Sequence, residues 1–266
     1  MQDKQPNRYQ ALVESLFFCA YQKGSGIVPF TREELVATAT TLGIVMTKNV
    51  GDVLYSFRYR NPLPTKILET QPEGMEWVIE GVGRAKYEFR LVPINRITPN
   101  SNLITIKIPD ATPEIIGANS LSDEQALLAK VRYNRLLDIF LGITAYSLQN
   151  HLRTTVKGLG QIEIDEVYVG IDRHGCQYVI PVQAKGGNDQ LSTVQAKQDI
   201  ACCAEKFPEL VCRAISAQFM DDSRIAIFEL GLESDGLVRI VEERHYRLVS
   251  ADEIDASDRE TYRRRA

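Results

Sequence analysis

The most restrictive pattern in this sequence is a predicted β-hairpin over residues 161–185. The spacing of apolar residues is helical up to Gly158 and then alternates, first over 161–171 and again over 177–185. Residues 172–175 (Asp-Arg-His-Gly) lie between the two runs and form a typical hairpin turn sequence. Helical patterns precede and follow this hairpin, so the chain is predicted to be an α/β (α+β) protein with a mixed sheet flanked by helices.

Polar side chains gather on one face of the predicted hairpin. Glu163 and Asp165 alternate with the apolar residues of the first strand, and Gln183 and Lys185 do the same on the second. Because a tight hairpin makes its two strands neighbours, we expect Asp165, Gln183 and Lys185 to converge, with Glu163 beside them. The two glycines at 186–187 would let the backbone pass close to a ligand.

Oxygen ligands beside a lysine suit the hydrolysis of a phosphodiester. Mg²⁺ takes oxygen ligands and keeps several of its waters, and it can polarise a phosphate and acidify a bound water. A lysine can hold that water or offset developing negative charge. The alternative interpretation is an ordinary strand pair with an Asp–Lys contact. A functional site is favoured by the glycine exit and by the helix that follows, for which Ser192 and Gln195 predict a capping box.

Two segments of the hairpin carry a family resemblance. Glu-Ile-Asp-Glu-Val-Tyr-Val-Gly at 163–170 and Ile-Pro-Val-Gln-Ala-Lys-Gly-Gly at 180–187 resemble the PD-(D/E)XK nuclease superfamily, which includes most type II restriction endonucleases. The resemblance covers about residues 121–232 and implies a core of a helix, three strands, a helix and a strand. It implies that Asp165 binds a metal and that Lys185 is catalytic. It gives Gln195 and Asp199 the accessory polar positions.

The sequence departs from the superfamily at one position. The acidic residue that the motif has two positions before its lysine is Gln183 here. An amide oxygen can ligate a metal but brings no negative charge, so three outcomes are open: Glu163 supplies the missing carboxylate, the metal binds weakly, or catalysis is lost. The expected metal ligands are therefore Asp165, Gln183 and Glu163, and the expected cofactor is Mg²⁺, with Mn²⁺ as the alternative.

The first part of the chain predicts three helices followed by a β-hairpin. The helices are expected over 9–21, 31–42 and 48–58, and the strands over 77–80 and 87–92. This is the element order of a winged helix, which presents its third helix and its hairpin to DNA. The predicted DNA contacts are Lys48, Arg58, Arg60, Arg84 and Lys86. The alternatives are a solvated surface and a protein-docking module.

The sequence thus predicts a winged-helix-like domain at 1–92 before a restriction-endonuclease-like domain at 121–249. Residues 93–120 are expected to be a connector with one β-rich run at 103–108, and the charged end at 250–266 is expected to be a mobile tail. Within the second domain, helices are expected from residue 122 to an interruption at Gly142 and over 144–152. Later strands are expected over 210–219, 224–230 and 238–249.

Composition narrows the chemistry and the location. The net charge of −4 disfavours a protein that coats DNA, although a local basic face is compatible with it. The chain has five cysteines without paired CxxC spacing and three histidines, so a metal would rest on oxygen ligands. His151 is expected to be structural, and Glu124 is a weaker candidate for an additional carboxylate. A polar start without a signal-peptide core and the lack of an apolar run long enough for a membrane span predict a cytoplasmic protein.

The leading interpretation is a metal-dependent endonuclease that cuts double-stranded DNA, site-specific and restriction-like. Cutting two strands at one site favours a homodimer. The first alternative is a non-catalytic DNA-binding protein with a degenerate nuclease fold, which Gln183 supports. The second alternative is a protein-interaction module that does not contact nucleic acid, which the acidic charge balance supports.

Overall fold

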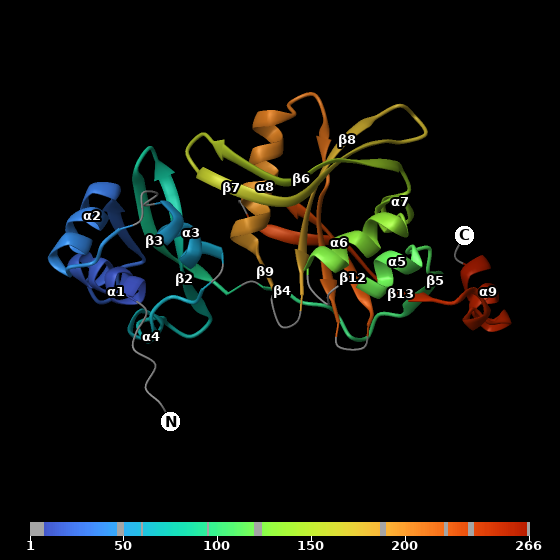
Figure 1. The fold of residues 1–266 in the computed structure, drawn as a ribbon, viewed down its shortest axis with the longest axis horizontal. Coiled ribbons are helices and arrows are strands. Elements are labelled where there is room, and N and C mark those ends of the chain that lie inside the picture. The colour runs from blue at the N-terminus through green and yellow to red at the C-terminus, as the bar shows by residue number, and fades with distance from the viewer. Residues whose placement is uncertain are drawn as a thin grey trace. The chain divides into compact units, whose positions relative to one another are not determined.

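The computed structural model describes the chain except for residues 1–7, 47–50, 60, 95, 120–123, 187–189, 221–222, 234–236 and 265–266. The chain divides into two compact units (Figure 1). The first consists of residues 1–94 together with 155–161, and the second of residues 95–154 together with 162–266. No helix in the described ranges is both long enough and apolar enough to cross a membrane.

The first unit packs helices against a small antiparallel sheet. Its helices are α1 (Arg8–Ala20), α2 (Arg32–Thr41), α3 (Gly51–Tyr59) and α4 (Thr65–Leu68). Its strands are β1 (Ile27–Thr31), β2 (Met75–Gly83) and β3 (Lys86–Pro93), in the order β1-β3-β2. Phe17 of α1, Trp77 of β2 and Phe89 of β3 meet in the core, with the ring of Phe17 edge-on to both of the others.

The predicted α2 is confirmed together with its capping box. Thr31 Oγ1 accepts a hydrogen bond from the N–H of Glu34 at 3.2 Å, and the Glu34 carboxylate accepts one from the N–H of Thr31 at 2.7 Å. The predicted hairpin is confirmed as β2 and β3. Strand β1 was not predicted. It contains Pro29, which an edge strand tolerates because one side of that strand makes no ladder hydrogen bonds.

An eight-stranded mixed sheet forms the centre of the second unit, and seven of its strands follow the order β5-β13-β12-β11-β8-β7-β6. These strands are β5 (Thr105–Pro109), β6 (Thr144–Val156), β7 (Gly160–Ile171), β8 (Gln177–Lys185), β11 (Ala214–Phe219), β12 (Ile225–Leu232) and β13 (Val238–Val249). The eighth, β10 (Val211–Cys212), pairs with β8. A separate pair joins β4 (Arg96–Ile97) to β9 (Leu191–Ser192). Strand β8 is antiparallel to β7 and parallel to β11, so the sheet is mixed.

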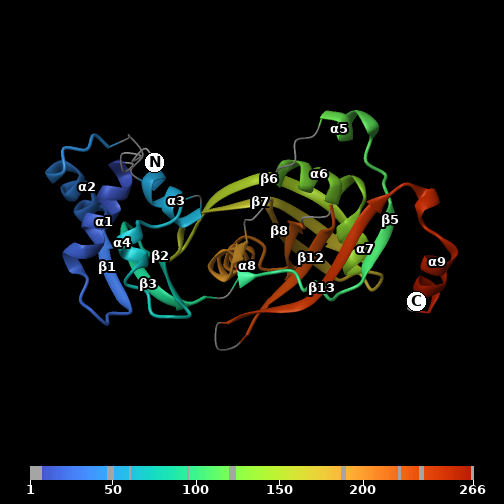
Figure 2. The same cartoon turned by 90° about the horizontal axis from the view of Figure 1, so that it is seen from below.

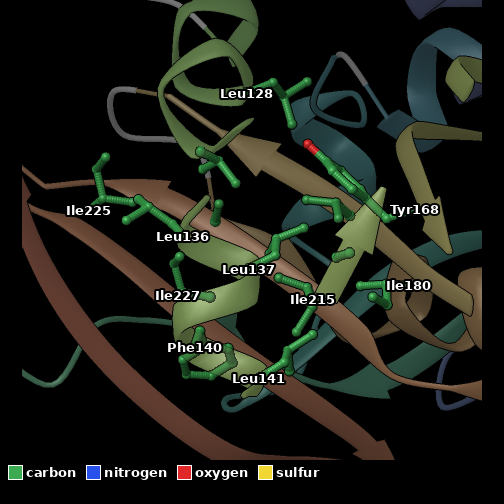
Figure 3. Packing of buried hydrophobic residues seen from close by; sticks show 14 of the residues in the cluster. Leu128, Leu136, Leu137, Phe140, Leu141, Tyr168, Ile180, Ile215, Ile225 and Ile227 are labelled. Carbon is green, nitrogen blue, oxygen red and sulfur yellow. The ribbon is translucent and has the colours of Figure 1, made fainter. Parts of the chain in front are cut away.

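Helices cover both faces of this sheet (Figure 2). The helices of the second unit are α5 (Glu114–Asn119), α6 (Glu124–Tyr133), α7 (Leu136–Leu141), α8 (Thr193–Lys206), the 3-10 turn η1 (Ala251–Glu253) and α9 (Ala256–Arg263). Leu128 of α6 and Leu137 of α7 pack with Ile180 of β8 and Ile215 of β11 (Figure 3). On the other face, Ala196 of α8 packs in a second core. The predicted mixed sheet flanked by helices is therefore confirmed.

The helix predicted over 144–152 is wrong, because these residues belong to the 13-residue strand β6. β6 is the outermost strand of the sheet, and most of its side chains are exposed on both faces. An edge strand of this kind lacks the alternation that identifies a half-buried strand in a sequence. The preceding helical stretch breaks at Arg135, which has φ +49°, and α7 ends at Gly142.

Two further segments differ from expectation. The connector predicted at 93–120 contains β5, which pairs in parallel with β13 and so is part of the main sheet. The charged tail contains α9, which contacts β5 through a hydrogen bond and an ion pair. The backbone N–H of Lys107 donates to Tyr262 Oη at 2.9 Å, and Lys107 Nζ lies 2.8 Å from an oxygen of Asp258.

Candidate active site

The candidate site lies where β7 and β8 leave their regular pairing. The antiparallel register runs from Ile171↔Gln177 to Glu166↔Val182. Beyond it, side chains bridge the strands. Asp165 Oδ2 accepts a hydrogen bond from the N–H of Ala184 at 2.9 Å, and Gln183 Nε2 donates to the backbone oxygen of Glu163 at 3.1 Å. The two strands therefore stay adjacent through bonds from a polar side chain of each to the backbone of the other.

Gln183 is the centre of a buried hydrogen-bond network. Its side chain is 1% exposed. Besides the bond to Glu163, Gln183 Nε2 donates to Asp199 Oδ1 at 3.2 Å, and Gln183 Oε1 accepts from Gln195 Nε2 at 2.8 Å. The backbone oxygen of Glu163 can only accept, which fixes the amide with its nitrogen toward Glu163 and Asp199 and its oxygen toward Gln195.

Helix α8 places Gln195 and Asp199 at this network. Ser192 begins the helix by accepting from the N–H of Gln195 at 3.4 Å, so the predicted cap is present. The side chain of Gln195, which the sequence assigned to the capping box, instead bonds to Gln183. One helical turn separates Gln195 from Asp199, so both side chains reach the same strand. The structure thus brings the two accessory residues to Gln183 of β8.

Lys185 lies at the last position of β8, with its side chain 14% exposed. Its Nζ is 3.7 Å from Glu124 Oε1 at the start of α6. No hydrogen bond joins Lys185 to Asp165 among the described residues, but the positive charge of Lys185 opposes the rise that burial causes in the pKa of Asp165. Of the glycines that follow, Gly187 lies outside the described residues.

The carboxylates of the site carry raised pKa values. Burial raises the pKa of Asp165, and the Ala184 N–H with the positive charges of Lys185 and His151 acts against that rise. Burial also raises the pKa of Glu163, and the neighbouring negative charge of Asp165 adds to the effect. Burial raises the pKa of Asp199 well above its ordinary range. Burial thus disfavours the charged form of all three carboxylates, and an added cation would favour it.

Strand β6 adds two residues that the sequence pattern did not place at the site. His151 Nδ1 lies 3.1 Å from Glu163 Oε1, and Arg153 Nε lies 3.3 Å from Glu163 Oε2. His151 has φ +50°, and its Nε2 lies 3.3 Å from Gln125 Nε2 of α6. Residues 151 and 153 are two apart, the spacing of a single strand face. The expectation of a helix over 144–152 concealed this signal.

The residues of the site fit a magnesium ion with few protein ligands. In the part of the chain that is described, no group of three or more His, Cys, Asp or Glu side chains could hold a metal. Mg²⁺ does not require such a group, because it is commonly bound by one or two carboxylates together with waters and substrate phosphates. Asp165 Oδ1 makes no hydrogen bond to a described residue, and Glu163 lies beside Asp165. The oxygen of Gln183, by contrast, is bonded to Gln195.

The predicted DNA contacts divide into three sets. Arg84 and Lys86 are exposed at the turn between β2 and β3, with Ala85 at φ +59° between them. Arg58 is half-buried on α3. Lys48 and Arg60 lie outside the described residues. The hairpin tip thus offers two exposed cations in the first unit.

Comparison with known proteins found no matching family model, no matching curated protein and no matching solved structure. Function must therefore be inferred from the residues themselves and from the order of the elements that carry them.

Proposed function

We propose that this protein is a metal-dependent endonuclease that hydrolyses phosphodiester bonds of double-stranded DNA, with a restriction-like, site-specific action. The observation that carries the proposal is the pair of carboxylates Glu163 and Asp165, two positions apart on β7 where β7 and β8 leave their regular pairing, with the charge of Lys185 acting on Asp165. Carboxylates with a neighbouring lysine suit phosphodiester hydrolysis with a hard cation.

The topology of the second unit supports the proposal. Helices α6 and α7, strands β6, β7 and β8, helix α8 and strand β11 come in this order along the chain, with the two-residue strands β9 and β10 before and after α8, and β11 is parallel to β8. This is the helix, three strands, helix and strand order that the PD-(D/E)XK resemblance implies. The first unit supports a winged-helix-like DNA-binding role through its helices, its β1-β3-β2 sheet and the exposed Arg84 and Lys86.

Each residue has a distinct role in the proposed reaction. Asp165 and Glu163 would hold Mg²⁺, or Mn²⁺ in its place. The bound cation would supply a polarised phosphate and an acidified water. Lys185 stabilises the negative charge that develops on the phosphate. Gln183 is a positioning residue in this scheme, because its amide ties the backbone of Glu163 to Asp199 and Gln195 rather than offering a ligand.

The proposal extends to the partners and location of the protein. Cleavage of both strands at one site calls for two active sites, which a homodimer provides. The five cysteines are all free thiols, the state that the reducing cytoplasm maintains, and we place the activity there.

The second candidate is a DNA-binding protein without catalysis. Two observations favour it: Gln183 replaces the acidic residue of the motif, and Glu163 is already paired with Arg153 and His151. Under this alternative the protein binds duplex DNA, and divalent cations do not lead to cleavage.

A plasmid assay tests the proposal. Supercoiled DNA incubated with the purified full chain should be converted to nicked and linear forms with Mg²⁺ and should stay supercoiled with EDTA. Asp165→Asn should leave the plasmid supercoiled in both conditions, because one carboxylate of the cation site is removed. Equal cleavage by wild type and Asp165→Asn would refute the assignment. Binding without cleavage across a series of divalent cations would establish the second candidate.

A further inference from the structure

The ion pair between Arg153 and Glu163 joins an exposed cation to a buried carboxylate. The Arg153 side chain is 58% exposed, whereas that of Glu163 is 9% exposed. Both oxygens of Glu163 face the guanidinium, at 3.3 Å from Nε to Oε2 and 3.4 Å from Nη2 to Oε1. The carboxylate is therefore held in place by its surroundings, and the arginine is the partner that can turn toward a ligand in solvent.

A guanidinium binds a phosphate with the same forked geometry that it uses for a carboxylate. The arginine can therefore exchange one anion for the other while keeping a two-point contact. The exchange requires that a second cation neutralise Glu163, because leaving a mostly buried carboxylate unpaired is unfavourable. A divalent ion bound between Glu163 and Asp165 would do this.

We propose that Arg153 is a switch residue that holds Glu163 when no divalent cation is bound and binds a DNA phosphate once the cation takes over Glu163. This inference rests on the proposed function and adds a coupling between its two ligands. Cation binding releases Arg153 for the duplex, and the duplex by reciprocity favours the cation. His151 contacts both Glu163 and Gln125, whereas the Arg153 side chain contacts Glu163 alone among the described residues, so Arg153 has fewer contacts to give up.

The test measures binding of a fluorescent duplex by anisotropy, in EDTA and in Ca²⁺, over a range of monovalent salt. Ca²⁺ replaces Mg²⁺ so that the duplex is bound without being hydrolysed. Wild type should bind about tenfold more tightly in Ca²⁺, the effect of one charge-assisted hydrogen bond. The slope of log affinity against log salt should steepen by about 0.9, the value of one phosphate contact.

Three variants test whether Arg153 exchanges the carboxylate for a phosphate. In EDTA, Arg153→Gln should have the same duplex affinity and the same salt slope as wild type. In Ca²⁺, it should lack both the gain in affinity and the steeper slope. Glu163→Gln frees the arginine, so it should show the steeper slope in EDTA already. Arg173→Gln removes an exposed arginine in the turn at the opposite end of the β7–β8 hairpin and should behave as wild type in both conditions.

The outcomes distinguish this inference from the proposed function. If Arg153→Gln follows wild type in both conditions, or binds more weakly by the same factor in EDTA as in Ca²⁺, the switch is refuted while Mg²⁺-dependent cleavage by the wild type can still stand. If the wild type does not bind duplex DNA at all, both the switch and the nuclease proposal are refuted.

Discussion

Gln183 holds three partners with one amide group, and that explains why an amide can be required at this position. Its nitrogen donates to the backbone oxygen of Glu163 and to Asp199, and its oxygen accepts from Gln195. A carboxylate at the same position would lose both donated bonds and face two acceptors. The departure from the motif is therefore consistent with a network built for an amide, in which Glu163 provides the second carboxylate.

Gln183→Glu is expected to lower the free energy of unfolding by about 1–3 kcal/mol, the cost of leaving buried polar groups unsatisfied. Urea denaturation at neutral pH measures this. Gln177→Glu is the matched control, because Gln177 is exposed on the same strand and its substitution should leave stability unchanged. If Gln183→Glu instead matched wild type in stability and bound Mg²⁺ more tightly, residue 183 would be a metal ligand.

The raised pKa of Asp199 predicts that the stability of the protein depends on pH. Burial raises its pKa well above the ordinary value of 3.8, so the native state retains a proton that the unfolded state releases. The free energy of unfolding therefore falls as pH rises from 3.8 toward the raised value. Asp199→Asn removes this contribution, and the variant should gain stability relative to wild type as pH rises through that window. Urea denaturation at a series of pH values measures the difference.

Asp172→Asn is the control for that series. Although burial acts in the other direction, the N–H groups of His174 and Cys176 lower the pKa of Asp172 below 3.8. The stabilising effect of the Asp172 carboxylate disappears as pH falls below 3.8. Above pH 3.8, the free energies of unfolding of Asp172→Asn and wild type should therefore change with pH in the same way. A difference between Asp199→Asn and wild type that does not change with pH would show that Asp199 titrates normally in the native state.

At the scale of elements, the spacing of apolar residues predicted a half-buried strand and missed an exposed one. Strand β7 buries alternate side chains over 162–166, so alternation identified it. Strand β8 is buried on both faces over 179–184, so the turn sequence before it was the clearer signal. Strand β6 is exposed on both faces, so its apolar residues do not alternate with polar ones. The segment 144–152 was therefore predicted to be a helix, and Arg153 was missed. The ion pair of Arg153 with Glu163 also depends on the pairing of β6 with β7, a contact that the spacing of either strand alone does not contain.

The β2–β3 hairpin gives a prediction for DNA binding. Reversing the charges of Arg84 and Lys86, which are exposed at its turn, should weaken duplex binding and reduce the log–log salt slope by about 0.9 for each phosphate that is no longer neutralised. Fluorescence anisotropy over a salt series measures both effects. Lys23→Glu, at an exposed lysine after α1, is the control and should keep the wild-type slope. An unchanged slope in the Arg84 and Lys86 double variant would move DNA recognition to the second unit.

For the whole molecule, the net charge of −4 means that the proposed DNA affinity would come from local groups rather than from a general attraction. Two candidate groups lie in different units: the β2–β3 turn with Arg84 and Lys86, and Arg153 on β6. The proposal therefore gives DNA contacts to both units and the chemistry to the second, where the two carboxylates and Lys185 lie.

The most direct test is single-turnover cleavage of a duplex that is already bound by excess protein, started by adding Mg²⁺. Wild type is expected to cleave, whereas Asp165→Asn and Lys185→Met are each expected to slow cleavage by at least about a hundredfold, the lower range for one catalytic group. Both variants should fold and bind the duplex in EDTA as wild type does. Cleavage by Lys185→Met at the wild-type rate would contradict the assignment of the active site to β7 and β8.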